Sequence, residues 1–246
     1  MVYISAFAWE RMLPMRVNDR YTSFYYALDE DCGKIEIDRK KTALLIVDMQ
    51  NYFVRRPACE NPSPREQLEN QRWSPFYDRI EQETIPNNVK ILARFRQLGM
   101  DVAFARITCQ REDGRDRSLD HKSTGFNELK LPLGDQEGEI IPELRPIRDE
   151  LVVMKTTDSA LTGTNLRLML HNMGIDTVVV TGVFTDQCVS CTVRSLADES
   201  FRVYLIEDAT MAGTLELHQQ ELTMLNNIYC HVINTEELLE ALGEGN

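Results

Sequence analysis

The chain alternates between short continuous runs of apolar residues and longer segments in which apolar residues recur every three or four positions. The continuous runs predict buried strands at residues 42–48, 101–107, 150–155, 176–182, 201–208 and, more weakly, 229–233. Because successive positions in these runs are apolar, both faces of each strand are expected to be covered, as in a parallel sheet.

The segments between these runs have helical periodicity. They predict helices at residues 87–99, 163–174, 185–200, 215–227 and 235–243. Gly99 and Gly174 stand where glycine commonly follows the last turn of a helix. Strands that alternate with helices in this way are typical of an open, mostly parallel α/β sheet with right-handed crossovers.

Three segments do not follow this alternation of predicted strands and helices. Residues 55–86 are rich in proline and charge, and residues 108–149 lack clear periodicity, so both are expected to form long loops that act as lids or subunit contacts. Residues 1–40 contain aromatic side chains that a disordered tail would not usually carry. We expect them to form an N-terminal arm that packs on the domain or on a neighbouring subunit, with residues 41–246 as a single domain.

The composition narrows the classes of partner and compartment. The net charge of −12 opposes binding to the phosphate backbone of nucleic acids. Six scattered cysteines in a chain of 246 residues indicate a reducing compartment rather than a disulfide framework. The first 20 residues lack the continuous apolar segment of a signal peptide, and no apolar run approaches the roughly 18 residues that span a membrane. We therefore expect a soluble, cytoplasmic protein with no nucleic-acid or membrane partner.

Chemically reactive side chains gather at the predicted strand ends. In an open α/β sheet, ligands bind beyond the carboxyl ends of the strands. The first strand ends at Asp48, the third ends at Lys155, and the loop after the fourth leads to Cys188. Because a buried ammonium is costly unless it is paired, Lys155 is expected to have a charged partner. An acid, a base and a thiol thus converge on one edge of the sheet.

Cys188 and Cys191 form a C-x-x-C pair with three competing interpretations. A structural zinc site needs four ligands, and the other cysteines and the four histidines supply no second matching pair. A redox dithiol also lies at a helix N-terminus, but disulfide exchange does not require Asp48 and Lys155. A single nucleophile uses all three groups.

In the single-nucleophile interpretation, Thr185 or Asp186 caps the helix, so that Cys188 lies in its first turn. There the helix dipole and the charge of Lys155 would favour a thiolate. Cys191 follows about one turn later, where a cysteine is most often a small core residue. We favour this interpretation.

These residues resemble the isochorismatase-like cysteine hydrolase superfamily. The matching blocks are ALLIVDMQNYF at 43–53, GEIIPELRPIRDELVVMKTTDSALTGTNL at 138–166 and GIDTVVVTGVFTDQCVSCTVRSLADESFRVYLIEDAT at 174–210. The resemblance implies an α/β fold with a Rossmann-like, open, mostly parallel sheet of about six strands with helices on both faces. It also implies a homodimer or homotetramer, and a cysteine hydrolase that needs no cofactor.

The resemblance further implies roles for individual residues. Asp48, Lys155 and Cys188 would form the catalytic triad, the peptide bond between Val183 and Phe184 would be cis, and the backbone amides of Phe184 and Cys188 would hold an oxyanion. The side chains expected near the substrate combine amide groups with flat apolar walls; they are Gln50, Phe53, Arg55, Phe184 and Gln187. Arg106, Arg111 and Arg115 are candidates to bind a substrate carboxylate.

The departures from the family indicate which branch this chain is similar to. The nicotinamidase branch carries a D-x-H-x-x-H metal site, whereas the corresponding segment here, RITCQREDGRD at 106–116, contains no histidine. A bound metal and nicotinamide are therefore disfavoured. Members that hydrolyse the vinyl ether of isochorismate lack the nucleophilic cysteine, which this chain retains at Cys188.

The resulting hypothesis is a metal-independent amidohydrolase. It would cleave a carbon–nitrogen bond of a small linear amide or ureide, similar to a carbamoyl compound or biuret, through a thioester, and it would release ammonia. Two alternatives remain: an isochorismatase-type vinyl ether hydrolase, and a dithiol redox protein that uses both cysteines of the C-x-x-C pair.

Overall fold

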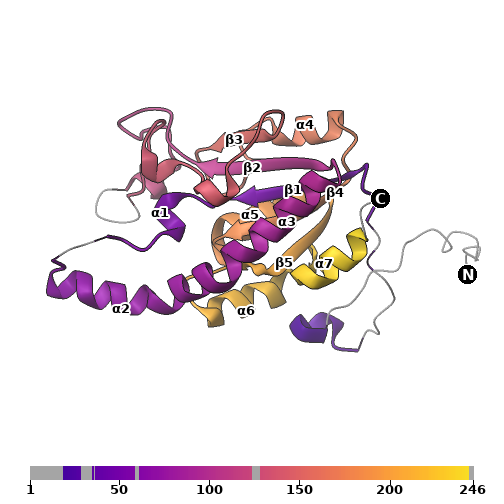
Figure 1. Cartoon of the computed structure of the whole chain (residues 1–246), viewed down its shortest axis with the longest axis horizontal. Helices are drawn as coiled ribbons and strands as arrows, with labels where there is room; N and C mark the ends of the chain where they lie inside the picture. The colour runs from indigo at the N-terminus through magenta and orange to yellow at the C-terminus, as the bar shows by residue number, and fades with distance from the viewer. Residues whose placement is uncertain (1–18, 29–34, 36, 59–60, 124–127, 244–246) are drawn as a thin grey trace, which may run out of the picture.

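The computed structural model describes residues 19–28, 35, 37–58, 61–123 and 128–243. Within them a single six-stranded sheet forms the centre of the molecule, in the order β3-β2-β1-β4-β5-β6, and every neighbouring pair is parallel (Figure 1). The strands are β1 (Thr42–Val47), β2 (Asp101–Ile107), β3 (Leu151–Lys155), β4 (Thr177–Val183), β5 (Arg202–Met211) and β6 (His231–Ile233). The predicted α/β class with about six parallel strands is confirmed.

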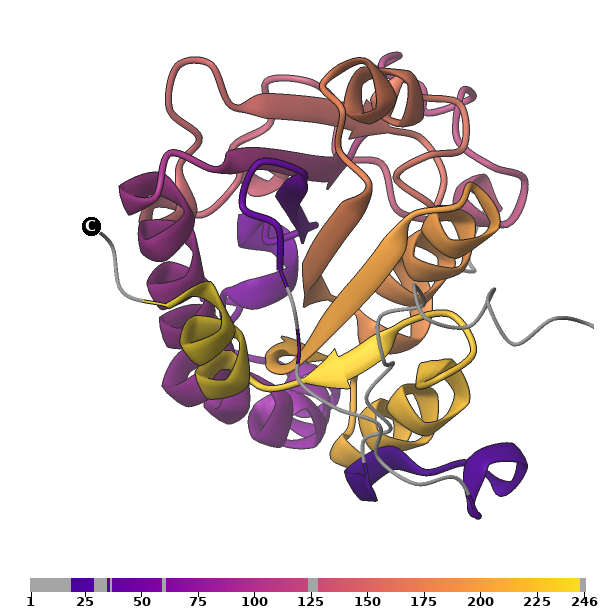
Figure 2. The ribbon, with the colours of Figure 1, turned by 90° about the vertical axis from the view of Figure 1, so that its right-hand side faces the viewer.

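Helices cover both faces of the sheet, as the view along it shows (Figure 2). One face packs against α4 (Leu166–Asn172), α5 (Ser190–Asp198) and α6 (Leu215–Leu225). The other face packs against α3 (Ile85–Gln97), α7 (Thr235–Leu242) and the end of α2 (Pro64–Arg79). Gly99 and Gly174 follow α3 and α4 with positive φ, as predicted for helix ends.

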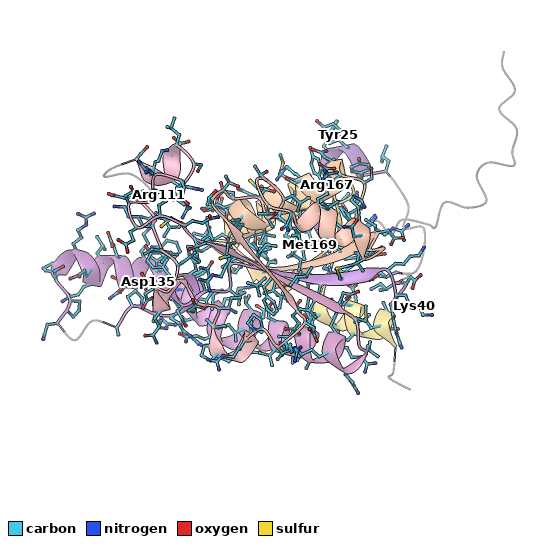
Figure 3. All side chains as sticks on the ribbon, turned by 90° about the horizontal axis from the view of Figure 1, so that it is seen from above. Tyr25, Lys40, Arg111, Asp135, Arg167 and Met169 are labelled. Carbon is cyan, nitrogen blue, oxygen red and sulfur yellow. The ribbon has the colours of Figure 1, made fainter. Side chains whose placement is uncertain are left out.

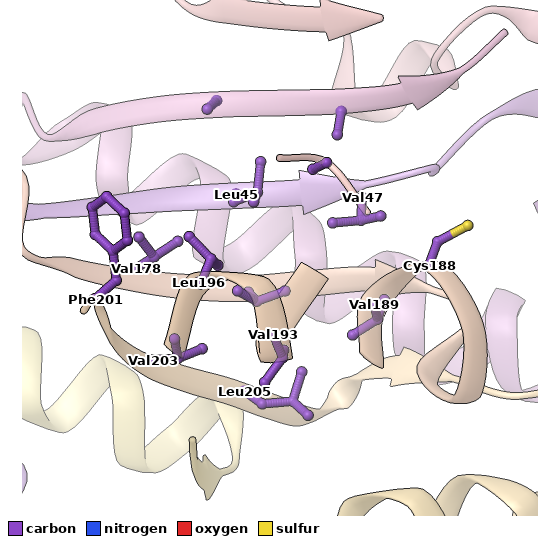
Figure 4. Close-up of a cluster of buried hydrophobic side chains, with 14 of the residues drawn as sticks. Leu45, Val47, Val178, Cys188, Val189, Val193, Leu196, Phe201, Val203 and Leu205 are labelled. Atoms are coloured by element: carbon purple, nitrogen blue, oxygen red, sulfur yellow. The ribbon is translucent and has the colours of Figure 1, made fainter. Parts of the chain in front are cut away.

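The core consists of two apolar clusters separated by the sheet. Alternate residues of β1 enter opposite clusters: Leu45 and Val47 enter one, and Leu44 and Ile46 the other. All six residues of β1 are buried, because this strand lies at the centre of the sheet with helices above and below. Cys188 lies at one end of the first cluster, and its sulfur points away from the apolar side chains (Figure 4).

The expectation that every strand is covered on both faces is wrong for β3. Val152 and Met154 are 41% and 44% exposed, whereas Val153 and Lys155 on the opposite face are buried. β3 is an edge strand, and the segment that precedes it, residues 128–149, contains only short 3-10 turns and loops. Those turns, η6 (Gln136–Gly138) and η7 (Pro142–Leu144), leave one face of β3 open to solvent.

The expectation of an irregular segment at residues 55–86 is also wrong for most of its length. Helix α2 begins at Pro64 and continues through a π-helical turn, η4 (Ile80–Thr84), into α3. A capping box starts it, in which Ser63 and Glu66 exchange backbone and side-chain hydrogen bonds. The helix escapes sequence analysis because its surface is mostly polar and because Pro75 lies within it, which normally indicates a helix end.

The described part of the N-terminal arm contacts the domain itself. Arg20 pairs with Glu207 and Glu237, at 2.8 Å and 2.9 Å, and the hydroxyl of Tyr21 donates to Glu207. The backbone then leads to Tyr25, which is 77% exposed at the surface (Figure 3). Residues 1–18, 29–34 and 36 of the predicted arm lie outside the described residues.

The strand order places a ligand site at one position in the sheet. The order of the strands reverses between β1 and β4, and in such folds the crevice beyond the carboxyl ends at this switch point binds ligands. Asp48 directly follows β1, and the segment that carries Cys188 directly follows β4. No helix among the described residues is long and apolar enough to cross a membrane.

The close approach of β4 to β1 depends on Gly182. Its φ is +113°, a region that side chains rarely adopt, and a Cβ atom at this position would overlap the backbone of Val47. We expect Gly182→Ala to lower the free energy of unfolding by more than about 3 kcal/mol, because it adds both backbone strain and a steric clash in the sheet.

Gly99→Ala is the matched control, since Gly99 also has positive φ but has open space around its Cβ position. It should cost only about 1 kcal/mol. Chemical denaturation of both variants measures the difference, and equal unfolding free energies would contradict the packing argument.

Candidate active site

Three side chains from distant parts of the chain meet beyond the switch point of the sheet. The Lys155 Nζ lies 2.7 Å from Asp48 Oδ2 and 3.2 Å from Cys188 Sγ. Asp48 and Lys155 are almost completely buried, and Cys188 is 6% exposed. The structure thus brings together the acid, the base and the thiol that the sequence placed at three strand ends.

The ammonium group of Lys155 contacts three partners. Besides Asp48 and Cys188, it donates to the carbonyl oxygen of Thr157 at 3.1 Å. A buried ammonium without partners would carry a large desolvation cost, so these contacts fix the position of Nζ. The side chain acts as a bridge between the carboxylate and the sulfur.

The charges of this group determine its resting protonation. Burial disfavours the charged form of Lys155, but Asp48 and Cys188 outweigh it, so the pKa of Lys155 is raised. Burial and then the charge of Asp48 raise the pKa of Cys188 well above its usual value. Burial and Asp48 therefore favour a thiol beside an ion pair, and they oppose the helix amides and Lys155, which were expected to favour a thiolate.

The backbone around Cys188 turns sharply after β4. The peptide bond between Val183 and Phe184 is cis, and the next residues form a π-helical turn, η8 (Thr185–Val189), that leads into α5. The expected helix cap is absent, because neither Thr185 nor Asp186 makes a capping hydrogen bond. Thr185 Oγ1 instead lies 2.8 Å from Nδ1 of His218, a buried side chain on α6.

Cys191 differs from Cys188 in its surroundings. It is exposed at the surface of α5, whereas Cys188 is buried at the end of a core cluster. The expectation of a small core residue at position 191 is therefore wrong: the π-helical turn before α5 shifts the face that each residue presents. No disulfide joins the two cysteines in the structure.

A cavity of about 950 Å³ opens in front of Cys188. Its walls come from the turn after β1, α1 (Asn51–Val54), α2, the ends of β2 and β4, and the loops after β2, β3 and β4. The lining residues among the described part of the chain include Asp48, Tyr52, Phe53, Arg55, Arg56, Glu69, Asn70, Trp73, Tyr77, His121, Glu128, Glu137, Asp158, Phe184, Gln187 and Cys188. This volume accommodates a small organic ligand.

Four of the residues expected near the substrate line this cavity. The rings of Phe53 and Phe184 meet edge to face at 5.8 Å and form an apolar wall. Gln187 is exposed at the cavity surface, and Arg55 lies at its edge in an ion pair with Glu143. The cavity therefore combines a flat aromatic wall with polar groups.

Gln50 is corrected as a substrate-binding residue. It is fully buried outside the cavity lining, and its amide nitrogen donates to the carbonyl oxygens of Ile107 and Gly138. Its amide oxygen accepts from the backbone of Ile107 at 2.8 Å. The side chain holds the end of β2 and a loop beside β1, so its hydrogen-bonding groups are not available to a ligand.

The three arginines considered for a substrate carboxylate also lie elsewhere. Arg106 is buried and pairs with Glu139 at 2.7 Å. Arg111 lies at the periphery of the molecule (Figure 3), where it and Arg115 both approach Asp113. None of the three lines the cavity.

Sequence analysis missed several residues of the cavity wall. Trp73 and Tyr77 come from α2, in the segment that was expected to be irregular. His121 and Asp158 face each other at 3.2 Å, and the Cys188 sulfur lies 3.5 Å from Asp158. Asp158 carried a usable signal, because it follows the strand-end Lys155 by three positions; His121 did not, because it lies in an aperiodic loop.

The described residues contain no group of three histidine, cysteine, aspartate or glutamate side chains that could hold a metal ion. His121 is the only one of the four histidines that lines the cavity within this part of the chain. The donor set of this site therefore does not fit the metal centre of the nicotinamidase branch.

His218 links the nucleophile loop to the acid stability of the protein. Burial lowers the pKa of His218 from 6.5 to about 4. In the unfolded chain His218 binds a proton below about pH 6.5, whereas in the folded chain it stays neutral down to about pH 4. The folded state therefore loses stability progressively as the pH falls from about 6.5 to about 4. We expect this residue alone to lower the free energy of unfolding by about 3 kcal/mol at pH 4.

The measurement compares denaturation of the parent protein and His218→Gln between about pH 7 and about pH 4. Glutamine cannot take up the proton, so the variant should lose less stability than the parent as the pH falls. Parallel pH profiles would show that His218 does not titrate between the folded and unfolded states as the burial requires.

The chain is similar to proteins of a known family. A model of the isochorismatase domain matches residues 42–237. The isochorismatase of Bacillus subtilis is 30% identical over 206 residues, which are 83% of this chain and 59% of that protein. The ureidoacrylate amidohydrolase RutB of Acinetobacter baylyi is 24% identical over 216 residues, 83% of this chain and 85% of that protein.

Solved structures show the same fold. A cysteine hydrolase from Pseudomonas syringae pv. phaseolicola has a TM-score of 0.71 at 22% identity, over 87% of this chain and 98% of that one. N-carbamoylsarcosine amidase from Thermoplasma acidophilum has a TM-score of 0.60 at 25% identity, over 80% of this chain and 97% of that one. The matched domain contains every strand of the sheet and all three residues of the site, and the chain belongs to the isochorismatase family of hydrolases.

Proposed function

We propose that this protein is a metal-independent cysteine amidohydrolase that cleaves a carbon–nitrogen bond of a small linear amide or ureide. One observation carries the proposal: the chain of contacts from Asp48 through Lys155 to the sulfur of Cys188, buried at the floor of a cavity of about 950 Å³. A nucleophile, a proton acceptor and a fixed positive charge are the groups that acyl transfer through a thioester requires.

The first step couples attack to proton transfer. Because Cys188 rests as a thiol, it becomes an effective nucleophile only as its proton leaves. Burial raises the pKa of Asp48, with Lys155 offsetting part of the effect, which makes this carboxylate a better proton acceptor than an exposed aspartate. The sulfur bonds to the substrate carbonyl carbon while the thiol proton passes to Asp48, and Lys155 keeps a positive charge beside the reacting atoms.

The remaining steps use the same groups and water. The carbonyl oxygen becomes an oxyanion, which the backbone amides of Phe184 and Cys188 would stabilise, since both residues border the cavity. As the tetrahedral intermediate collapses, the carbon–nitrogen bond breaks and the leaving nitrogen takes the proton from Asp48. Water, deprotonated by Asp48, then attacks the thioester, and the carboxylic or carbamic acid leaves with regeneration of the thiol.

Two relatives favour amides over other substrates of the family. RutB is named as a ureidoacrylate amidohydrolase, and the Thermoplasma acidophilum structure is an N-carbamoylsarcosine amidase. Both act on ureido or carbamoyl groups, which are planar and fit between the aromatic wall of Phe53 and Phe184 and the polar side of the cavity. We therefore place the substrate among small ureides and carbamoyl compounds.

Substrate and nucleophile can be tested together by ammonia release. A panel of biuret, carbamoyl amino acids and nicotinamide, with a metal chelator present, is compared for the parent protein, Cys188→Ala and Cys191→Ala. We expect turnover of at least one ureide, a loss of at least about 1,000-fold in Cys188→Ala, and little change in the matched control Cys191→Ala, whose side chain is exposed.

Equal losses in the two cysteine variants would instead support the dithiol alternative. No ammonia from any compound, together with pyruvate release from isochorismate, would support vinyl ether hydrolysis and overturn the proposal. Each outcome thus assigns the protein to one of the three functions.

The role of Asp48 predicts opposite effects on two measurements. Asp48→Asn removes a charge that raises the pKa of Cys188 and leaves Lys155 beside the sulfur to stabilise a thiolate. We expect alkylation of Cys188 by iodoacetamide at about pH 7 to become roughly tenfold faster. Ammonia release should fall by at least about 100-fold, because the proton acceptor is lost.

Both measurements use a Cys191→Ala background, with the modified peptide identified by mass spectrometry, so that the exposed Cys191 does not contribute. Slower alkylation in Asp48→Asn would show that Asp48 promotes the thiolate in the resting protein, contrary to the electrostatics of the site.

A further inference from the structure

Asp158 places a carboxylate beside the nucleophile that the catalytic cycle does not use. It lines the cavity, and its Oδ1 lies 3.5 Å from Cys188 Sγ, within reach of a weak S–H donor. Its side chain remains 36% exposed, and among the described residues nothing hydrogen-bonds to Oδ2. Oδ1 thus contacts Cys188 and His121, and the half-buried side chain is part of the cavity lining.

A buried arginine and a histidine orient this carboxylate. Arg117 is 3% exposed, and it donates to the carbonyl oxygens of Thr156 and Leu129 and, at 3.1 Å, to His121 Nδ1. Because a guanidinium can only donate, Nδ1 of His121 is the acceptor, and its proton lies on Nε2. His121 Nε2, which carries the proton, lies 3.2 Å from Asp158 Oδ1. The tautomer, and with it the direction of the contact to Asp158, is set by Arg117.

The histidine in this contact is neutral. Burial lowers the pKa of His121, and Arg117 acts in the same direction, although Asp158 opposes them. A neutral imidazole lies beside Asp158 without adding a positive charge to it. No lysine or arginine nitrogen among the described residues lies within 4.0 Å of Asp158. Asp158 therefore has no lysine or arginine ion-pair partner in the described part of the chain, and it lies next to the sulfur.

The rest of the cavity wall adds no free positive charge in the described part of the chain. Arg55 and Arg56 line the cavity, but both are paired with glutamate or aspartate side chains outside it. Lys155 is buried and paired with Asp48. A substrate that carries a carboxylate would meet Asp158 in a cavity whose lining arginines already pair with carboxylates of the protein.

We propose that Asp158, oriented by Arg117 and His121, binds N–H groups attached to the scissile carbonyl, and that it makes the site selective for neutral or cationic ureides over ureides that carry a carboxylate. The inference rests on the proposed function and names the substrate class of that site. It excludes carbamoyl amino acids as preferred substrates, and it favours ureides without a carboxylate, such as biuret.

The geometry agrees with this substrate class. In an attacking arrangement the carbonyl carbon lies about 3 to 3.5 Å from the sulfur. Asp158 Oδ1 is itself 3.5 Å from the sulfur, so an N–H group on that carbon can reach the carboxylate when the substrate nitrogen lies on the Asp158 side. A charged acceptor strengthens such a bond relative to a neutral one.

Kinetics on three ureides of similar size and different charge test the inference: N-carbamoylglycine (anionic), biuret (neutral) and 2-aminoethylurea (cationic). The parent protein should have kcat/KM values for biuret and 2-aminoethylurea at least about tenfold above that for N-carbamoylglycine. Asp158→Asn should raise KM for the neutral and cationic compounds about tenfold, with a smaller change in kcat, and should narrow the gap to the anion.

Asp149→Asn is the matched control. Asp149 lies in an exposed loop outside the cavity, and its positive φ suits asparagine, so the same change of charge there should leave the selectivity unaltered. An unchanged order of substrates in Asp158→Asn, or a preference of the parent protein for N-carbamoylglycine, would overturn the assignment of Asp158.

Binding without turnover separates this inference from the proposed function. The three ureides are titrated by calorimetry into Cys188→Ala and into Cys188→Ala with Asp158→Asn. Weaker binding of the neutral and cationic compounds in the double variant supports the role of Asp158 even if the parent protein hydrolyses none of them, an outcome that would reject only the amidohydrolase. Equal binding in both variants overturns the inference even if ammonia is released.

Discussion

The buried ion pair between Asp48 and Lys155 is the interaction on which the rest of the site depends. Two charges removed from water are costly unless they meet each other in good geometry, and here they meet at 2.7 Å. Asp48 follows the central strand and Lys155 ends the edge strand, so the pair joins the ends of β1 and β3 across β2. The remaining hydrogens of the ammonium then fix the sulfur of Cys188 and the loop after β3.

The topology of the sheet positions Cys188, the third residue of the site. The strand order reverses between β1 and β4, so the chains leaving these strands diverge and expose a crevice at their ends. Gly182 lets β4 lie against Val47 at that point, and His218 contacts the nucleophile loop from α6 through Thr185. Packing thus holds Cys188 at the boundary between the apolar core and the cavity.

The electrostatics of this site act differently on Cys188 before and during its attack on a substrate. Burial and Asp48 keep Cys188 protonated at rest, while Lys155 compensates the charge that develops during attack. Much of the cavity wall comes from α2 and from the loops after β2 and β3. In our reading, the charge of that wall, above all at Asp158, selects the ligand.

The sequence by itself determined the parallel sheet, the strand ends and the convergence of Asp48, Lys155 and Cys188, because apolar runs of buried strands are local patterns and their carboxyl ends share one edge. Only the tertiary structure decided which side chains face the cavity. Helix α2 is mostly polar, so its sequence shows no clear helical repeat of apolar residues. The side chain of Gln50 hydrogen-bonds to the backbone of Ile107. His121 lies near Asp158 although its loop has no periodic pattern. Such contacts join residues far apart in the chain, and no local pattern encodes them.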